Sequence, residues 1–321
     1  MLRFIVKRLL LMIPTLLGIT LLVQLFIMIT PGDPVRLMLG TQTSEEEIAK
    51  VREEMGLNKP FVVRYGTYIG NILLHGDFGK SYRTHTSALS EILLRFPYTL
   101  ALVSIAMVLA LCIGIPLGIY AATHQRTWKD NAAIFTSLFC VSMPGFWFAL
   151  ILIQIFAVKL KILPATGVDD WKGWILPAIT LALAYAATIA RQMRSNLLEV
   201  IRQDYITTAR AKGQTEQKVL YRHGLKNAVI PVIMIGGMIF GLALGGSMIS
   251  EQVFSMPGLG NYTLAALAAR DYPVIQTSVL FLSALFAVVL LLIDIAFAIV
   301  DPRIRAQYAR KKTKVKKGAA Q

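Results

Sequence analysis

The sequence is poor in charge. Only 16% of its 321 residues are Asp, Glu, Lys or Arg, while 55% are hydrophobic, and its mean hydropathy is +0.60. Ordinary soluble domains carry roughly 25% charged residues. The composition therefore disfavours a soluble monomer and favours a protein that crosses a membrane several times.

Residues that carry chemistry are also scarce. Cys112 and Cys140 are the only cysteines, and both lie in apolar runs without C-x-x-C spacing, which disfavours a disulfide or a thiolate metal site. The four histidines are scattered and form no H-E-x-x-H motif. Residues 79–81 (GKS) resemble the end of a nucleotide-binding P-loop, but Leu74 stands where its first glycine is required. We therefore predict no catalytic site, cofactor or metal on this chain.

Acidic residues are fewer than basic ones, 18 against 33, which gives a net charge of +15. Such a balance could indicate a nucleic-acid partner. The Lys and Arg residues, however, collect beside apolar runs and at the C-terminus, as they do on the cytoplasmic flanks of membrane proteins. We expect membrane lipid, and no nucleic acid, as the partner of this charge.

Six apolar runs are long enough to cross a bilayer, which needs about 20 residues. They cover residues 9–29, 99–122, 132–158, 174–190, 228–250 and 277–300. The basic short loops place both termini in the cytoplasm. The third run contains Pro144-Gly145, which can kink or break a helix, either for packing or to line a translocation path. The sequence predicts an all-α polytopic membrane protein with six spans.

The runs divide the chain into regions. We predict an N-terminal tail and first helix (1–30), a large extracytoplasmic loop region (31–98), a five-helix core (99–300) and a basic cytoplasmic tail (301–321). The core includes a cytoplasmic loop (191–227) and an extracytoplasmic segment (251–276). Within 31–98, Ser44 followed by Glu47 predicts a capped helix over residues 44–55.

The predicted spans contain almost no charge. Asp294 stands near the inner end of the last span, where we expect it to pair locally rather than to relay protons. The chain thus lacks obvious groups for coupling to an ion gradient, so any transport energy should come from outside it. Gly237, Gly241 and Gly245 recur every four residues and predict close helix packing, within the chain or with a partner.

The cytoplasmic loop has its own helix signals. Asp204 is a candidate helix cap and Gly213 a candidate helix end. A second helix is predicted to begin at Gln214 or Thr215 and to end near Asn227. Composition alone leaves two interpretations open, an ordinary basic connector at the membrane surface or a docking site with small side chains.

The loop sequence DYITTARAKGQTEQKVLYRHGLKNAVIPV (204–232) resembles the conserved cytoplasmic loop of binding-protein-dependent ABC importer permeases. The form is that of the dipeptide, oligopeptide and nickel branch, as in the B-type permease of peptide importers. The passages RLLLMIPTLLGITLLVQLF, PGDPVR, HGDFGKS, EQVFSMPGLGNYTLAALAARDYPVIQ and DPRIR are similar to the same branch and occur in the same order. Residues 207–209 read Thr-Thr-Ala instead of the general Glu-Ala-Ala, and residues 223–226 read His-Gly-Leu-Lys instead of Ile-x-Leu-Pro. The peptide branch shares both departures, which put in doubt any salt bridge from the missing Glu.

The resemblance implies a type I ABC importer permease fold in a bacterial inner membrane. It implies a pore subunit, not an enzyme, that pairs with a second related permease and moves by alternating access. Two cytosolic ATPase subunits would bind ATP and Mg, and an extracytoplasmic solute-binding protein would deliver di- or oligopeptides, or alternatively glutathione or nickel chelates. The residues that it assigns to ATPase coupling are Asp204, Tyr205, Thr208, Ala209, Arg210, Ala211, Gly213 and Gln214. A self-contained secondary transporter or channel is the alternative from another class.

Overall fold

The computed structural model describes residues 2–30, 32–39 and 43–300. In this part of the chain the regular structure is helical, apart from an isolated antiparallel bridge between Lys80 and Ser87. The predicted basic tail, residues 301–321, lies outside the described residues.

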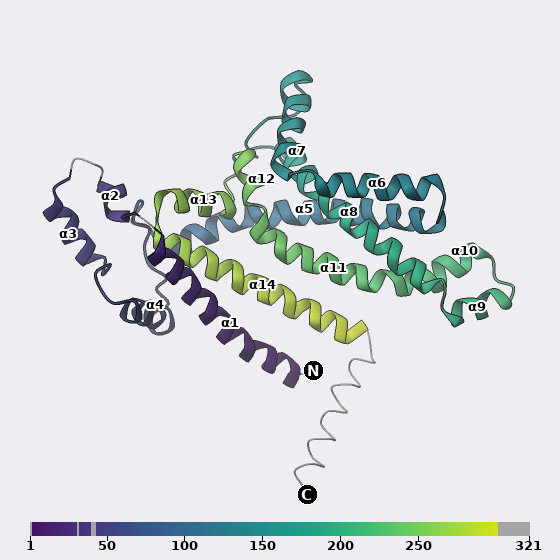
Figure 1. The fold of residues 1–321 in the computed structure, drawn as a ribbon, viewed down its shortest axis with the longest axis horizontal. Coiled ribbons are helices and arrows are strands. Elements are labelled where there is room, and N and C mark those ends of the chain that lie inside the picture. The colour runs from purple at the N-terminus through teal and green to yellow at the C-terminus, as the bar shows by residue number, and fades with distance from the viewer. Residues whose placement is uncertain (1, 31, 40–42, 301–321) are drawn as a thin grey trace, which may run out of the picture.

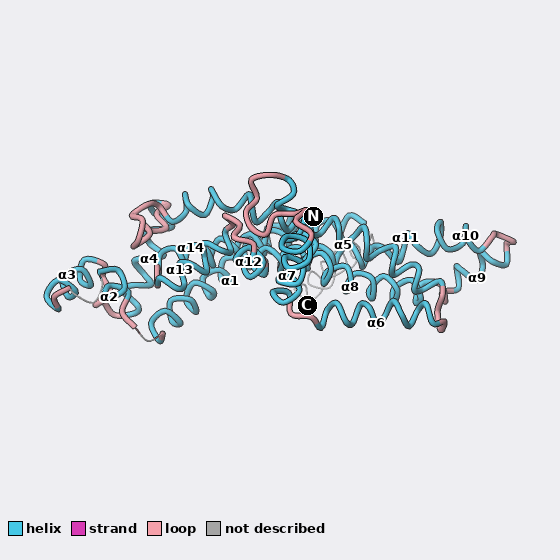
Figure 2. Tube along the Cα trace, turned by 90° about the horizontal axis from the view of Figure 1, so that it is seen from above, coloured by secondary structure: helices cyan, strands magenta, loops and turns pink. Residues whose placement is uncertain are grey.

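Long helices lie side by side along the longest axis of the molecule, and short helices cover its two ends (Figures 1 and 2). In chain order the elements are α1 (Leu2–Ile29), α2 (Pro34–Leu39), α3 (Glu45–Glu54), α4 (Phe61–His75), α5 (Ala88–Thr123), α6 (Trp128–Ser142), α7 (Gly145–Leu152), η1 (Ile153–Lys159), η2 (Trp171–Trp174), α8 (Ile175–Val200), α9 (Asp204–Ala211), α10 (Glu216–Lys218), η3 (Val219–Gly224), α11 (Leu225–Gly246), α12 (Met248–Val253), α13 (Leu259–Ala269) and α14 (Tyr272–Val300). In both views α3 lies at one end of the bundle and α9 at the other.

The third predicted span is not a straight helix. Five helices in the described chain are long and apolar enough to cross a membrane, and α6 with α7–η1 makes a sixth only if this bent pair is counted as one span. The pair bends by 98° at Met143 and Pro144, which are both extended, with ψ of 128° and 126°. Proline lacks the N–H that a helix needs and pushes the preceding residue into extended backbone, so α7 stands away from α6 (Figure 1).

Several helices extend beyond the predicted spans. α5 begins at Ala88, inside the region predicted as loop, and α8 continues past Ala190 to Val200. α14 begins at Tyr272, inside the predicted extracytoplasmic segment. With 36 residues, α5 is about 54 Å long, which exceeds the roughly 30 Å of a bilayer core. Hydropathy marks the part of a helix inside lipid, whereas hydrogen bonding continues the helix into water.

The centre of the bundle is the contact between α5 and α8. A Cβ atom on Gly114 would lie 2.6 Å from the backbone oxygen of Ala186, and one on Gly118 would lie 2.5 Å from that of Ala190. Only glycine allows such an approach, and close backbones are how helices gain packing in lipid. The buried Ile189 lies at the same contact. This contact fixes the middle of α8 against α5.

The peripheral helices follow local sequence signals. Ser44 caps α3, and its Oγ accepts from the backbone N of Glu47 at 3.3 Å, so the predicted cap is confirmed. α1 packs along α14. Arg8 pairs with Asp294 at 2.9 Å between side-chain Nη2 and Oδ2, which confirms the expected local pairing.

Candidate functional site

Residues 201–224, here called the α9–η3 loop, project at one end of the bundle (Figures 1 and 2). Gln203, not Asp204, holds the N-cap position, and it makes no side-chain cap bond. The predicted cap was therefore wrong by one residue, and Asp204 sits in the first turn, where the helix dipole favours a negative charge. The helix ends at Ala211 and the chain turns at Gly213, whose φ is +75°. Gly213 thus stops α9 as predicted, because glycine adopts positive φ without steric cost.

The α9–η3 loop has a small apolar core of its own. Ile206, Ala209 and Val219 are buried against one another. They attach the inner face of α9 to the start of η3. The opposite face of α9 is exposed and carries Asp204, Tyr205, Thr207, Thr208 and Ala211.

Side-chain pairs close the α9–η3 loop from outside. Arg210 donates from Nε to Glu216 Oε2 at 3.0 Å and from Nη2 to Oε1 at 2.6 Å. This bidentate hydrogen bonding to Glu216 raises the pKa of Arg210. Gln214 and His223 lie 2.9 Å apart between Oε1 and Nε2. These bonds fix the turn around Gly213 on both sides.

The sequence analysis did not predict three residues that bond to side chains of the α9–η3 loop, two within the loop and one at the start of α11. Glu216 and His223 belong to the pairs above, and Asn227 Nδ2 donates to the hydroxyl of Tyr205 at 2.9 Å. Arg210 and Glu216 are six residues apart across a turn, which is not a helix-face spacing. Tyr205 and Asn227 meet only because the loop folds back on itself. No local pattern signals such contacts.

The second predicted helix does not end near Asn227. Thr215 takes the N-cap position, and the helical backbone continues through Gly224 into α11, so that residues 216–246 form one helix of 31 residues. Gly224 is helical here, with φ −78° and ψ −59°, and therefore does not stop the helix. The α9–η3 loop is consequently connected to the bundle by a continuous helix.

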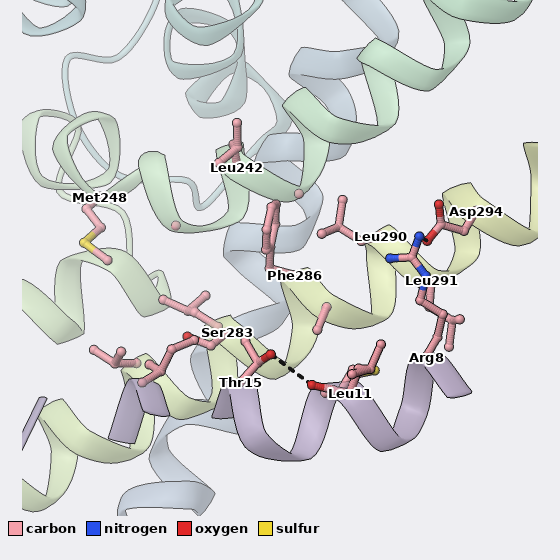
Figure 3. Close-up of a pocket in the computed structure, with 17 residues that line it drawn as sticks. Arg8, Leu11, Thr15, Leu242, Met248, Ser283, Phe286, Leu290, Leu291 and Asp294 are labelled. Carbon is pink, nitrogen blue, oxygen red and sulfur yellow. Dashed lines mark hydrogen bonds and ion pairs between the residues drawn. The ribbon is translucent and has the colours of Figure 1, made fainter. Parts of the chain in front are cut away.

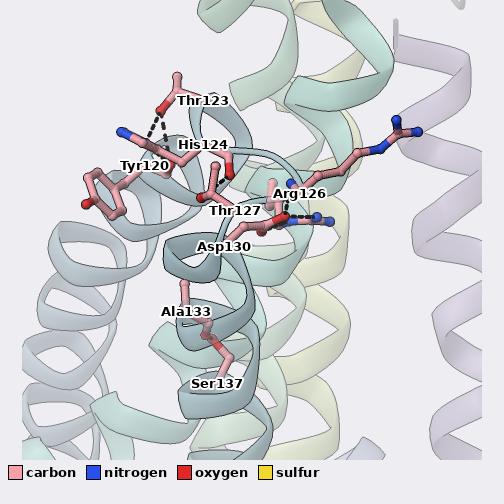
Figure 4. A network of polar contacts seen from close by, with 9 residues as sticks. Tyr120, Thr123, His124, Arg126, Thr127, Asp130, Ala133 and Ser137 are labelled. Carbon is pink, nitrogen blue, oxygen red and sulfur yellow. Dashed lines mark hydrogen bonds and ion pairs between the residues drawn. The ribbon is translucent and has the colours of Figure 1, made fainter.

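A buried ion pair braces α8 before it enters the α9–η3 loop (Figure 4). Asp130, at the start of α6, is only 2% exposed and accepts two hydrogen bonds from Arg194 of α8, at 2.6 and 2.7 Å. The backbone N of Arg126 adds a third at 3.1 Å. Bidentate Arg–carboxylate bonds are strong and orientation-specific. Asp130 lies beside a basic loop in the sequence, where nothing signals its burial.

Between α11 and α14, residues 247–271 form the α12–α13 segment, which surrounds a fully buried acid. Glu251 is 0% exposed and accepts from Thr99 Oγ1, Ser247 Oγ and the backbone N of Asn261 at 2.7 to 2.9 Å. A Cβ atom on Gly258 would lie 2.3 Å from its carboxylate. The predicted polar external segment is thus a packed helical element.

Asp271 closes the α12–α13 segment against the chain before α5. It accepts from Ser81 Oγ and, at 3.0 Å, from the backbone N of Tyr82. Ser81 belongs to the GKS sequence that resembles a P-loop, so these contacts give that sequence a structural role. In the described residues no group of three or more His, Cys, Asp or Glu could hold a metal ion.

The three spaced glycines of α11 differ in their surroundings. A Cβ atom on Gly237 would lie 2.7 Å from Ile293, and one on Gly241 would lie 2.8 Å from Phe286, both on α14. Gly245 has nothing within 4 Å. It lines, with Gly241, a cavity of about 530 Å³ between α1, α11 and α14 (Figure 3). Two of the three predicted packing positions therefore meet a helix of the same chain.

Residues 114–306 match the family described as "Binding-protein-dependent transport system inner membrane component". Residues 1–103 match its N-terminal counterpart, "Binding-prot-dependent transport system membrane comp, N-term". The chain belongs to this permease family. It is a multi-pass inner-membrane protein and a permease component of an ABC importer of the peptide, oligopeptide and nickel branch, as its sequence passages indicate.

Curated relatives of the permease match along nearly their whole length. It is 42% identical over 305 residues to "Glutathione transport system permease protein GsiC" of Salmonella choleraesuis (strain SC-B67), with 95% of this chain and 99% of the relative covered. The protein of the same name from Escherichia coli (strain K12) is 41% identical with the same coverage. The relatives thus include both the first helix and the core.

Solved structures share the fold of the permease core. One is described as inward-facing conformations of the MetNI methionine ABC transporter, with a TM-score of 0.57, 18% identity, and 66% of this chain and 97% of that chain covered. Another is an amino acid ABC transporter with histidines, with a TM-score of 0.51, 15% identity, and 67% and 94% covered. These likenesses establish the type I importer permease fold.

Proposed function

We propose that this permease imports short peptides, glutathione-like peptides included, as one half of a translocation path shared with a second related permease. Two cytosolic ATPases that bind ATP and Mg drive it, and an extracytoplasmic solute-binding protein delivers the substrate. The named relatives at 41–42% identity are glutathione transport permeases, and glutathione is itself a short peptide. This supports the peptide class over other solutes.

The observation that carries the proposal is the α9–η3 loop. One face of α9 is open to solvent, while the other is held by the Ile206, Ala209 and Val219 core. The loop passes without a break into α11. A partner that binds the exposed face of α9 would therefore move a continuous helix rather than a flexible connector. Closure of two ATPases would pull two such loops together and tilt the spans into an outward-open state, and ATP hydrolysis would reset them.

The proposal places the α9–η3 loop, both termini and the 301–321 tail in the cytoplasm. The extracytoplasmic regions are then residues 31–98 and 251–276. The first helix lies in residues 1–30, and the core is residues 99–300, which include the coupling loop 191–227. Arg8 near the start of α1 pairs with Asp294 near the end of α14. This pair supports placing both termini on one side of the membrane.

The test replaces Gly213 in the reconstituted importer. Gly213 has positive φ and no neighbour within 4 Å of a Cβ, so Val would strain the backbone by about 1–3 kcal/mol without a clash inside the chain. Asn tolerates this conformation far better. We expect Gly213→Val to insert and assemble but to hydrolyse ATP without matching uptake. Gly213→Asn separates two possible causes of uncoupling, strain in the turn and a side chain in the way of docking. If only the conformation of the turn matters, this variant keeps ATP hydrolysis coupled to uptake. If docking requires a residue without a side chain, it uncouples them.

Gly76 supplies a matched control. It ends α4 with φ +64° and also has open space around a Cβ, but it lies away from the α9–η3 loop (Figure 1). Gly76→Val should carry similar strain and keep uptake in step with ATP hydrolysis. Coupled uptake at the wild-type ratio in Gly213→Val would count against the docking role.

The alternative of a self-contained carrier or channel has a direct test. The purified chain alone in liposomes should transport no peptide along a proton, sodium or substrate gradient. Addition of the second permease, the ATPases, the binding protein and ATP should start uptake. Transport by the chain alone would show that it does not need external ATPases.

A further inference from the structure

A polar cavity of about 330 Å³ lies at the end of the bundle opposite the α9–η3 loop. Its walls come from the outer part of α1, the turn after α3, the length of α4, the chain before α5 and the first turns of α14. The cavity therefore lies where the N-terminal region meets the last helix. Its volume is near the lower end of the roughly 300–1,000 Å³ of small-molecule sites.

The cavity is lined by donors and carries an excess of positive charge. Lys59 and Arg64 lie on its wall, and neither makes an ion pair with another described residue. Among the side chains that the structure describes, no Asp or Glu lines it. The remaining polar walls are the amides of Gln24, Asn71 and Gln276 and the hydroxyls of Thr67, Tyr68, Tyr82 and Tyr272.

Part of this lining is firmly held. Gln24 is buried although it belongs to a membrane-spanning helix, and it accepts a hydrogen bond from Gln276 Nε2 at 2.8 Å. Tyr272 is buried and meets Tyr82 edge to face, with ring centroids 6.3 Å apart. Burial also raises the pKa of Tyr82 to about 12, so its hydroxyl stays a neutral donor at physiological pH. Prearranged donors bind with less loss of entropy than mobile ones.

We propose that this cavity binds the free carboxylate of a short peptide on its way into the importer, with the carboxylate at Arg64 and Lys59. Cationic donors suit a carboxylate, and the amides of Gln24, Asn71 and Gln276 can donate to or accept from peptide groups. The proposal rests on the proposed function for its substrate class and adds the place and the group that recognises it.

The test measures equilibrium binding to the complete importer in phosphatidylcholine nanodiscs, without the solute-binding protein. The probes are radiolabelled alanyl-alanine and alanyl-alaninamide, which lacks the carboxylate. We expect alanyl-alanine to bind about tenfold more tightly, since hydrogen bonds to a charged group are the stronger ones. Arg64→Gln and Lys59→Gln should each reduce that preference, and Arg64→Lys should restore part of it.

Lys50→Gln is the matched control, because Lys50 is an exposed cation of α3 outside the cavity. It should bind both probes as the wild type does. Size-exclusion profiles and unfolding temperatures check that each variant assembles. An unchanged preference in assembled Arg64→Gln would overturn the proposal, as would equal competition by inorganic phosphate and alanyl-alanine.

A lipid headgroup could supply an anion of similar chemistry. Nanodiscs that contain phosphatidylglycerol separate this source, and loss of peptide binding in them would overturn the peptide assignment. ATP-driven uptake of alanyl-alanine by the wild-type importer is measured in parallel. No uptake would refute the proposed function, whereas normal uptake with no Arg64 effect on binding or uptake would refute only the cavity assignment.

Discussion

The α12–α13 segment and the α9–η3 loop both join two long helices, but their charged groups have opposite surroundings. Glu251 is fully buried among three hydrogen-bond donors. Arg210 and Glu216 pair at the surface, with 41% and 67% of their side chains exposed. A buried, satisfied carboxylate locks its neighbours because its loss leaves donors unpaired. A surface pair shapes a loop whose outer face stays exposed, which suits the proposed docking of a partner.

The largest expected effect is at Glu251. Glu251→Ala leaves the donors of Thr99, Ser247 and Asn261 without an acceptor, so we expect a loss of about 3 kcal/mol or more in the free energy of unfolding. Glu251→Gln keeps one oxygen and should cost less. The measurement is the thermal unfolding midpoint in detergent, with the exposed Gln252→Ala as control. Equal midpoints for Glu251→Ala and Gln252→Ala would break the comparison.

An intermediate effect is expected at Asp271. In Asp271 the two carboxylate oxygens accept from Ser81 Oγ and from the backbone N of Tyr82. Asp271→Asn leaves only one of these oxygens, which should lower the free energy of unfolding by about 1–3 kcal/mol. The same unfolding assay applies. Asp169→Asn serves as control because Asp169 is exposed and should change stability little. An Asp271→Asn midpoint as high as that of Asp169→Asn would contradict the locking role.

The smallest effect on stability is expected in the α9–η3 loop. Arg210→Gln should cost less than about 1 kcal/mol, as is usual for exposed ion pairs, and less at high salt. Glu216→Gln should cost a similar amount, and the double variant little more. Unfolding midpoints at low and high salt check this. A loss at Arg210 as large as at Glu251 would show that the loop is part of the rigid framework.

Apolar runs predicted the spans because lipid demands them, and Gly213 predicted the end of α9 because few residues adopt its backbone conformation. The contacts between distant residues were not predictable in this way. Glu251 lies in a polar stretch, where an acid is ordinarily exposed, and only the fold brings Thr99 to it. Asn227 belongs to a longer helix because Gly224 stays helical. A glycine in the sequence does not indicate whether a helix continues through it or ends there.

The pair of Arg8 and Asp294 also has a consequence for biosynthesis. The first helix leaves the ribosome before the last helix is made, so these two residues meet only after α14 has been synthesised. An acid within a membrane-spanning segment is costly to insert alone, and Arg8 of α1 supplies a charge opposite to that of Asp294. The ion pair between the first and last spans can therefore form only after α14 has been made.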